Sequence, residues 1–281
     1  MKSGIHMIRL IAADMDGTLL DENGLLPSHF GEVFERLCKE NILFAVASGR
    51  QYGNLLNHFR EFRDKMVFIA ENGTFVVYRG ETLYSSVLAF PDVLELAAMA
   101  KKVPGAACVV CGIRAAYVEN NDVAGRPEAL AEIRKYYAAV ELVDSFRDVS
   151  DEILKFTVLV FEGSEKYALP VFAGYKDRFK LTVSGDYWLD ITMHEANKGI
   201  ALDHIQTRFG IAKQETMAFG DFLNDVELLQ NAGYSYAMKN AHPGLFPHAR
   251  FRAMGNEEDG VLREISRMLD TPSEFNANLH I

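Results

Sequence analysis

Two acidic residues at the end of an apolar run are the first candidates for chemistry in this sequence. Residues 8–13 are typical of a buried strand in a parallel sheet, and Asp14 and Asp16 follow, with Gly17 next. Side chains alternate along an extended chain, so we expect both carboxylates on one side. Because two dehydrated carboxylates repel each other, a hard divalent cation is expected between them. A solvated acidic turn is the alternative for this pair taken alone.

The elements around this pair form a strand–helix–strand unit. A helical pattern separates the first apolar run from a second one at residues 42–47, and a third follows at residues 66–70. Strands joined by such crossovers lie parallel, and ligands bind outside their carboxyl ends. The sequence therefore predicts an α/β fold with a doubly wound, mostly parallel, Rossmann-like sheet and a site at the carboxyl edge.

Other polar residues follow predicted strands or begin a helix, so they are expected at the same edge. They are Ser48 and Gly49 after the second strand, Lys198 before a helix over residues 200–209, and Asp221, Asn224 and Asp225 after a strand over residues 215–219. Singly, Ser48 and Asp221 could cap helices and Lys198 could be a solvated surface residue. An acid pair, a hydroxyl, a cation and a second acid pair at one edge are improbable by chance.

The alternation of strands and helices changes in the middle of the chain. Residues 74–86 are typical of a hairpin, and short strands and helices follow to about residue 186. Antiparallel strands combined with helices favour a separate α+β unit inserted into the first one. We expect core segments over residues 1–81 and 190–281 and an inserted α+β domain over residues 82–189.

Composition limits the partners and the compartment. The 281 residues exceed the usual size of one domain, and the net charge of −10 argues against nucleic acid or an anionic membrane. No apolar run approaches the roughly 18 residues of a membrane span. The N-terminus has no signal-peptide core, so a cytoplasmic protein is expected. It stays open whether residues 1–6 are native or precede a natural start at Met7.

The three cysteines fit a reducing compartment without a disulfide framework. Cys108 and Cys111 match the C-x-x-C pattern, but the surrounding residues are strand-like and no active-site helix follows. No second pair of cysteines or histidines completes a zinc site. We therefore expect neither a redox nor a zinc role for this pair.

Four motifs taken together resemble those of the haloacid dehalogenase superfamily: Asp14-Met15-Asp16-Gly17-Thr18, Ser48-Gly49-Arg50, Asn197-Lys198-Gly199 and Gly220-Asp221-Phe222-Leu223-Asn224-Asp225. Their order, their spacing and the long insertion resemble its Cof-like phosphatase branch over nearly all of residues 8–269, and the insertion over residues 82–189 resembles the cap domain of that branch. The resemblance implies a magnesium-dependent phosphatase that hydrolyses small phosphorylated metabolites, such as sugar phosphates, through an aspartyl-phosphate. A monomer or small homo-oligomer is expected.

The resemblance also implies a role for each motif residue. Asp14 would be the nucleophile and Asp16 the general acid and base. Magnesium would be held by Asp14, the backbone carbonyl of Asp16 and Asp221, with Asp225 acting through water or supporting these ligands. The phosphate-binding groups would be the amides of Met15 and Gly49, the Ser48 hydroxyl, Lys198 and Asn224. Thr18 is also a candidate phosphate-binding residue and is expected to orient Asp16. Arg50 is a candidate anion contact.

Alternatives stay open at this point. A phosphomutase or phosphotransferase could use the same core, and a receiver-like phosphate-binding module shares an Asp, a Lys and a hydroxyl. Asp16 and the cap argue against a receiver, which needs neither. Polar and aromatic cap residues could contact the leaving group or simply pack the cap: Tyr117, Glu119, Asn120, Arg126, Tyr187 and Trp188.

Overall fold

The computed structural model describes residues 7–137 and 139–271, so the prediction about residues 1–6 lies outside it. The chain divides into two compact units, which are Met1–Tyr84 with Asn197–Ile281, and Ser85–Ala196. No helix in the described part of the chain is long and apolar enough to cross a membrane.

The first unit is built on an eight-stranded sheet in the order β14-β13-β12-β1-β2-β3-β4-β5. Neighbouring strands from β14 to β3 are parallel, and β4 is antiparallel to β3. The strands are β1 (Leu10–Asp14), β2 (Leu43–Ala47), β3 (Val67–Ala70), β4 (Phe75–Tyr78), β5 (Glu81–Ser85), β12 (Thr216–Gly220), β13 (Tyr234–Met238) and β14 (Phe251–Ala253). The predicted mostly parallel α/β sheet is confirmed.

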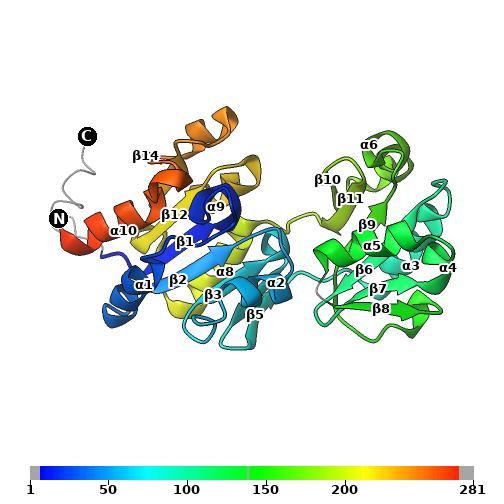
Figure 1. Cartoon of the computed structure of the whole chain (residues 1–281), viewed down its shortest axis with the longest axis horizontal. Coiled ribbons are helices and arrows are strands. Elements are labelled where there is room, and N and C mark those ends of the chain that lie inside the picture. The colour runs from blue at the N-terminus through cyan, green and yellow to red at the C-terminus, as the bar shows by residue number, and fades with distance from the viewer. Residues whose placement is uncertain (1–6, 138, 272–281) are drawn as a thin grey trace. The chain divides into compact units, whose positions relative to one another are not determined.

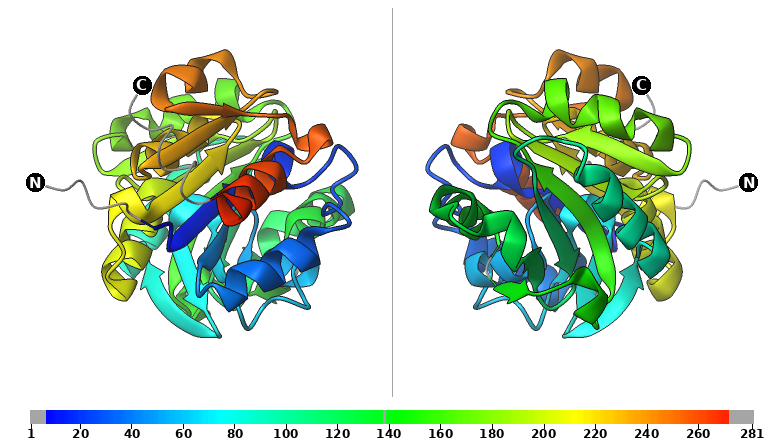
Figure 2. Two further views of the ribbon diagram at one scale, coloured as in Figure 1. Left: turned by 90° about the vertical axis from the view of Figure 1, so that its left-hand side faces the viewer. Right: turned by 90° about the vertical axis from the view of Figure 1, so that its right-hand side faces the viewer.

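Helices cover both faces of this sheet. They are α1 (Phe30–Lys39), α2 (Tyr52–His58), α8 (Lys198–Phe209), α9 (Val226–Gln230) and α10 (Gly260–Asp270). Helix α1 packs beside α10, as the left view of Figure 2 shows, and α8 packs beside α9. The strand order runs outward from β1 in both directions, so right-handed crossovers place α1 and α9 on opposite faces. This is the doubly wound arrangement.

The strand register brings the chemical groups to one edge. Asp14, the last residue of β1, pairs with Ala47, so Ser48 follows directly beside it. On the other side of β1, Ala13 pairs with Phe219, two residues before Asp221. The central strand and both its neighbours therefore end at one level, each followed by a candidate site residue.

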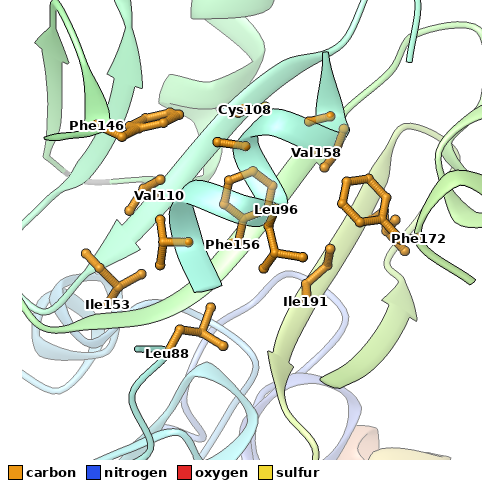
Figure 3. Packing of buried hydrophobic residues seen from close by; sticks show 14 of the residues in the cluster. Leu88, Leu96, Cys108, Val110, Phe146, Ile153, Phe156, Val158, Phe172 and Ile191 are labelled. Atoms are coloured by element: carbon orange, nitrogen blue, oxygen red, sulfur yellow. The ribbon is translucent and has the colours of Figure 1, made fainter. Parts of the chain in front are cut away.

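The second unit has a six-stranded sheet in the order β10-β11-β9-β6-β7-β8. Its neighbours are antiparallel except for the parallel pair β7 and β8. Its elements are β6 (Ala107–Gly112), β7 (Ala116–Glu119), β8 (Val140–Val143), β9 (Ile153–Leu159), β10 (Phe179–Val183) and β11 (Trp188–Met193), with helices α3 (Phe90–Ala100), α4 (Asn120–Val123), α5 (Pro127–Tyr136), α6 (Ser164–Tyr167) and α7 (Leu169–Phe172). Figure 1 labels most of them, and Figure 3 shows Leu96, Val110, Phe156 and Ile191 in one apolar cluster of this α+β unit.

The unit boundaries lie later than the sequence places them. The chain leaves the first unit after Tyr84, not after residue 81, because β5 completes the first sheet. It returns after Ala196, not after residue 189, because β11 pairs with β10 and β9 in the second sheet. An alternating strand pattern does not reveal which of two sheets a strand joins.

The C-x-x-C pair consists of two separate core thiols. Cys108 and Cys111 both lie on β6. They are three residues apart along the strand, so their side chains point to opposite faces of the sheet. Accordingly, each belongs to a different apolar cluster of the second unit, and both are buried cysteines that are not part of a disulfide.

Candidate active site

A buried ion pair joins the end of β1 to the start of α8. Lys198 is the first residue of α8 and is fully buried, and Asp14 is 6% exposed. The Lys198 Nζ donates to Asp14 Oδ1 and, at 2.7 Å, to Asp225 Oδ1. Asn197 caps this helix by accepting from the Ile200 N–H at 2.9 Å. A buried cation at a helix N-terminus is opposed by desolvation and by the helix dipole, and the carboxylates of Asp14 and Asp225 offset this cost.

The environment shifts the proton affinities of these groups. Burial lowers the pKa of Lys198, but the carboxylates of Asp14 and Asp225 outweigh burial and raise it overall, so the ammonium stays charged. Burial raises the pKa of Asp14 well above its ordinary value, although Lys198 opposes the shift. Burial and the neighbouring Asp225 also raise the pKa of Asp221. Burial is thus the main cause of both carboxyl shifts, and the neighbouring carboxylates add to it.

Three carboxylates form a cluster that fits a divalent cation. One oxygen from each of Asp14, Asp221 and Asp225 lies within 4.8 Å of the others. Lys198 is bonded to two of these carboxylates, and the four side chains together have a formal charge of −3 + 1 = −2. Oxygen-only ligands and an uncompensated negative charge are what Mg²⁺ prefers. The donor set therefore fits the expected metal.

Asp225 differs from the other two carboxylates because both of its oxygens already have partners. Its Oδ1 accepts from Lys198, and its Oδ2 accepts from the N–H groups of Asp221 and Phe222 at 3.0 and 3.2 Å. The side chain is fully buried. Asp225 thus holds the loop that carries Asp221, which favours the supporting role over direct metal ligation.

Thr18 contacts Asp221, not Asp16. Its buried hydroxyl donates to Asp221 Oδ1 at 3.0 Å, so the prediction that Thr18 orients Asp16 is wrong. The reason is Gly17, whose φ of +79° turns the chain between the two residues. A Cβ on Gly17 would lie 2.5 Å from Asp221 Oδ2, so only glycine lets this turn approach the carboxylate. The hydroxyl hydrogen given to Asp221 is not available to a phosphate oxygen.

Asp16 has a cation of its own. Arg50 donates from Nε to Asp16 Oδ2 at 3.1 Å and from Nη2 to Oδ1 at 2.6 Å, and its Nη1 lies 2.8 Å from His58 Nε2. The Asp16 side chain is half exposed, and its carboxylate is not part of the three-carboxylate cluster. The expectation that Asp14 and Asp16 share one side and one cation is therefore wrong for the side chains. Strand β1 ends at Asp14, so strand alternation does not extend to Asp16.

The loops after β2 and β12 supply polar groups that the sequence predicts. Ser48 is buried, and its Oγ accepts from the Arg50 N–H at 3.1 Å, which leaves the hydroxyl hydrogen to donate elsewhere. Asn224 is exposed and donates to Asn72 Oδ1 at 3.0 Å. Asn72 follows β3 and was not among the predicted site residues. Its position after a parallel strand was the only signal that could have indicated it.

The candidate cap residues are mostly engaged within the second unit. Tyr117 donates to Asp151, Asn120 donates to Asp144, Glu119 accepts from the Phe146 N–H, Arg126 donates to three backbone carbonyls, and Trp188 is buried, whereas Tyr187 is 40% exposed. Five of the six therefore have a partner or are buried within the second unit, and a contact of any of them with the leaving group stays a prediction.

Comparisons with known proteins agree with this geometry. Residues 11–265 match the family described as haloacid dehalogenase-like hydrolase. The 5-amino-6-(5-phospho-D-ribitylamino)uracil phosphatase YbjI of Escherichia coli is 32% identical and covers 95% of this chain and 98% of its own length. The HMP-PP phosphatase of Klebsiella pneumoniae is 29% identical, over 95% of this chain and 97% of its own length. A solved structure from Eubacterium rectale has a TM-score of 0.86 at 28% identity, over 94% of this chain and 100% of its own.

The match spans both units and all four motifs, and the architecture agrees with that of a solved relative. The resemblance noted from the motifs is confirmed, and the chain belongs to the haloacid dehalogenase-like hydrolase family.

Proposed function

We propose that this protein is a magnesium-dependent phosphatase that hydrolyses small phosphorylated metabolites through an aspartyl-phosphate on Asp14. The family is one of hydrolases, and both curated relatives above are named as phosphatases, which supports action on phosphate monoesters. The observation that carries the proposal is the buried Asp14 carboxylate. It ends the central strand, is held by Lys198 and lies beside Asp221.

The chemistry divides into two displacements at phosphorus. In the first, an Asp14 oxygen bonds to phosphorus, the bond to the leaving oxygen breaks, and Asp16 gives that oxygen a proton. In the second, Asp16 takes a proton from water, the water oxygen bonds to phosphorus, and the bond to Asp14 breaks. Splitting the reaction in this way matters because uncatalysed hydrolysis of phosphate monoesters is so slow that enzymes accelerate it up to about 10²¹-fold.

The surrounding groups position these two acids. Lys198 holds the Asp14 carboxylate, and Arg50 holds Asp16 with two hydrogen bonds. The Ser48 hydroxyl hydrogen and the backbone amides of Met15 and Gly49 would donate to the phosphoryl oxygens, where negative charge gathers. Asn224 would add a polar contact through the hydrogen that its bond to Asn72 leaves unused.

Magnesium would be held by Asp14, the backbone carbonyl of Asp16 and Asp221, and when bound it would neutralise charge on the transferring phosphoryl group. Asp225 would support this set from behind, because it already binds Lys198 and the loop amides. Thr18 fixes Asp221 by its hydrogen bond.

The substrate is proposed only as a class. The two curated relatives are named for different phosphorylated metabolites, so relatives of this similarity do not share one substrate. Sugar phosphates and similar small esters fit the proposal. A cytoplasmic location and a monomeric or small homo-oligomeric state stay predictions from the sequence.

The test is phosphate release from p-nitrophenyl phosphate and a panel of phosphorylated metabolites. We expect turnover with Mg²⁺, loss of turnover after chelation, and recovery when Mg²⁺ returns. Asp14→Asn should fold normally and show no turnover, because an amide does not attack phosphorus. Exposed Asp64→Asn is the matched control and should keep full activity, since its side chain is 83% exposed. Activity of Asp14→Asn within tenfold of the parent would contradict the proposal.

A further inference from the structure

The turn after β3 has an unusual backbone. Glu71, Asn72 and Gly73 have φ values of +50°, +54° and +96°, so three consecutive residues are in the left-handed region and two of them are not glycine. L-residues adopt this region rarely, and asparagine tolerates it better than most. Such a conformation persists only where surrounding contacts hold it in place, and it is frequent at functional sites.

The contacts of this turn reach the segment that carries Ser48. The Glu71 N–H donates to the Arg50 carbonyl and the Asn72 N–H donates to the Ser48 carbonyl, both at 3.0 Å. A Cβ placed on Gly49 would lie 3.0 Å from Asn72 Nδ2, so the asparagine amide packs directly against that glycine. The turn is therefore joined to the Ser48 loop by both backbone and side chain.

The same turn reaches the other two site segments. Asn72 Oδ1 accepts from Asn224 Nδ2 at 3.0 Å, which joins it to the loop after β12. A Cβ on Gly73 would lie 2.2 Å from the backbone carbonyl oxygen of Asn197 and 2.7 Å from the backbone nitrogen of Lys198, so the turn packs against the start of α8. Three residues thus contact the segments that carry Ser48, Lys198 and Asn224, which are far apart in sequence.

We propose that Asn72 is a positioning residue, which fixes Asn224 and the Gly49 loop relative to the Asp14 carboxylate. Its effect on turnover rests on the proposed function above, whereas its effect on the two loops does not. Asparagine suits the role because it accepts the left-handed backbone and offers an uncharged acceptor. Aspartate would offer the same acceptor but place a negative charge beside the phosphate site.

The test uses Asn72→Gly, which keeps the left-handed backbone and removes only the amide. The matched control is Asn41→Gly, because Asn41 has a φ of +57°, is exposed, and lies in the turn before β2 at the opposite end of that strand. We expect Asn72→Gly to lower kcat/KM for p-nitrophenyl phosphate about tenfold, the usual scale for one lost orienting hydrogen bond. The control should match the parent, and both should melt within a few degrees of it.

A double-mutant cycle with Asn224→Ala separates positioning from a general structural effect. Both single variants break the same hydrogen bond, so the double variant should be little worse than the worse single variant. Losses in kcat/KM that multiply, or an Asn72→Gly variant indistinguishable from Asn41→Gly, would overturn the proposal.

Amide hydrogen exchange gives a readout that does not need turnover. In Asn72→Gly, exchange should accelerate at residues 48–50 and 222–225, and in Asn41→Gly it should not. If the parent enzyme proved inactive but this local acceleration were seen, the proposed function would fall and the positioning role would stand. Unchanged exchange at both segments would refute the positioning role of Asn72.

Discussion

Neutralising Asp221 should make the metal-free protein more stable while removing its response to magnesium. The perturbation is Asp221→Asn, which keeps the shape of the side chain and an oxygen that can still accept from Thr18. It removes one of three carboxylates that lie within 4.8 Å of one another, of which Asp14 and Asp225 are paired with Lys198 and Asp221 is not. In the metal-free state the substitution therefore relieves repulsion in a partly buried site.

The magnitude follows from the distances. Two unit charges 4.8 Å apart interact by about 3 kcal/mol at an effective dielectric constant of 20. Asp221 loses repulsion from two carboxylates and attraction to one ammonium, so the net gain is about that of one pair. Solvent screening at this half-buried side chain reduces it to about 1–2 kcal/mol. For a protein of this size that corresponds to a rise in Tm of roughly 2–8 °C.

The pH dependence has a definite sign. Burial and Asp225 raise the pKa of Asp221 above its ordinary value of 3.8, so the native state binds more protons than the unfolded state above about pH 4. Stability of the metal-free parent contributed by this group is therefore present at low pH and is lost as pH rises through the native pKa. The Tm advantage of Asp221→Asn should consequently grow between pH 4 and neutral pH.

The assay is thermal melting of parent, Asp221→Asn and the exposed control Asp64→Asn, with chelator and with Mg²⁺. We expect Mg²⁺ to raise the Tm of the parent and the control but not of Asp221→Asn. A metal-free Asp221→Asn less stable than the parent would refute the electrostatic reasoning. A full Mg²⁺ response in this variant would refute the assignment of Asp221 as a ligand.

Three further outcomes are expected. Lys198→Met should lower stability by about 3–5 kcal/mol in urea unfolding and abolish turnover, because it leaves buried carboxylates without their cation. Gly17→Ala should lower kcat at least about tenfold, since its Cβ would meet Asp221. The control Gly24→Ala has a similar φ of +74° but nothing within 4 Å of the added Cβ, so it should lower stability and leave kcat unchanged. Equal kcat in the two variants would contradict this reasoning. Burial raises the pKa of Tyr236 above its unfolded value, so the stability of the parent should fall as pH rises above about 10. In urea unfolding, Tyr236→Phe should therefore lose less stability than the parent between pH 8 and pH 11.

The strand ends could be predicted from the sequence because local patterns determine them. The apolar run before Asp14 and the polar residues after each strand place the candidates at one sheet edge by a general rule of parallel sheets. The predicted helix after Lys198 is also present, with Asn197 as its N-cap and the left-handed Gly210 at its end. Strands β8 and β14 were missed because they are short and partly exposed, so no apolar run marks them.

The partners within the site could not be predicted in the same way. The Thr18 hydroxyl binds Asp221 across 203 positions of sequence, and Asp16 binds Arg50 across 34. Both depend on where the chain turns at Gly17, which residue types alone do not specify. Asn72 was missed because its position after a parallel strand was its only sequence signal, whereas its left-handed backbone and its contact with Asn224 are visible only in the structure.

The central claim is that the phosphoryl group is transferred to Asp14 first and to water second. The stereochemistry at phosphorus tests this claim most directly. Each in-line displacement inverts the configuration at phosphorus, so two displacements restore it. A thiophosphate ester made chiral with oxygen isotopes, hydrolysed in water of the third isotope with Mg²⁺ present, should give thiophosphate with retained configuration. Inverted configuration would show a single direct attack by water and would contradict the covalent role of Asp14.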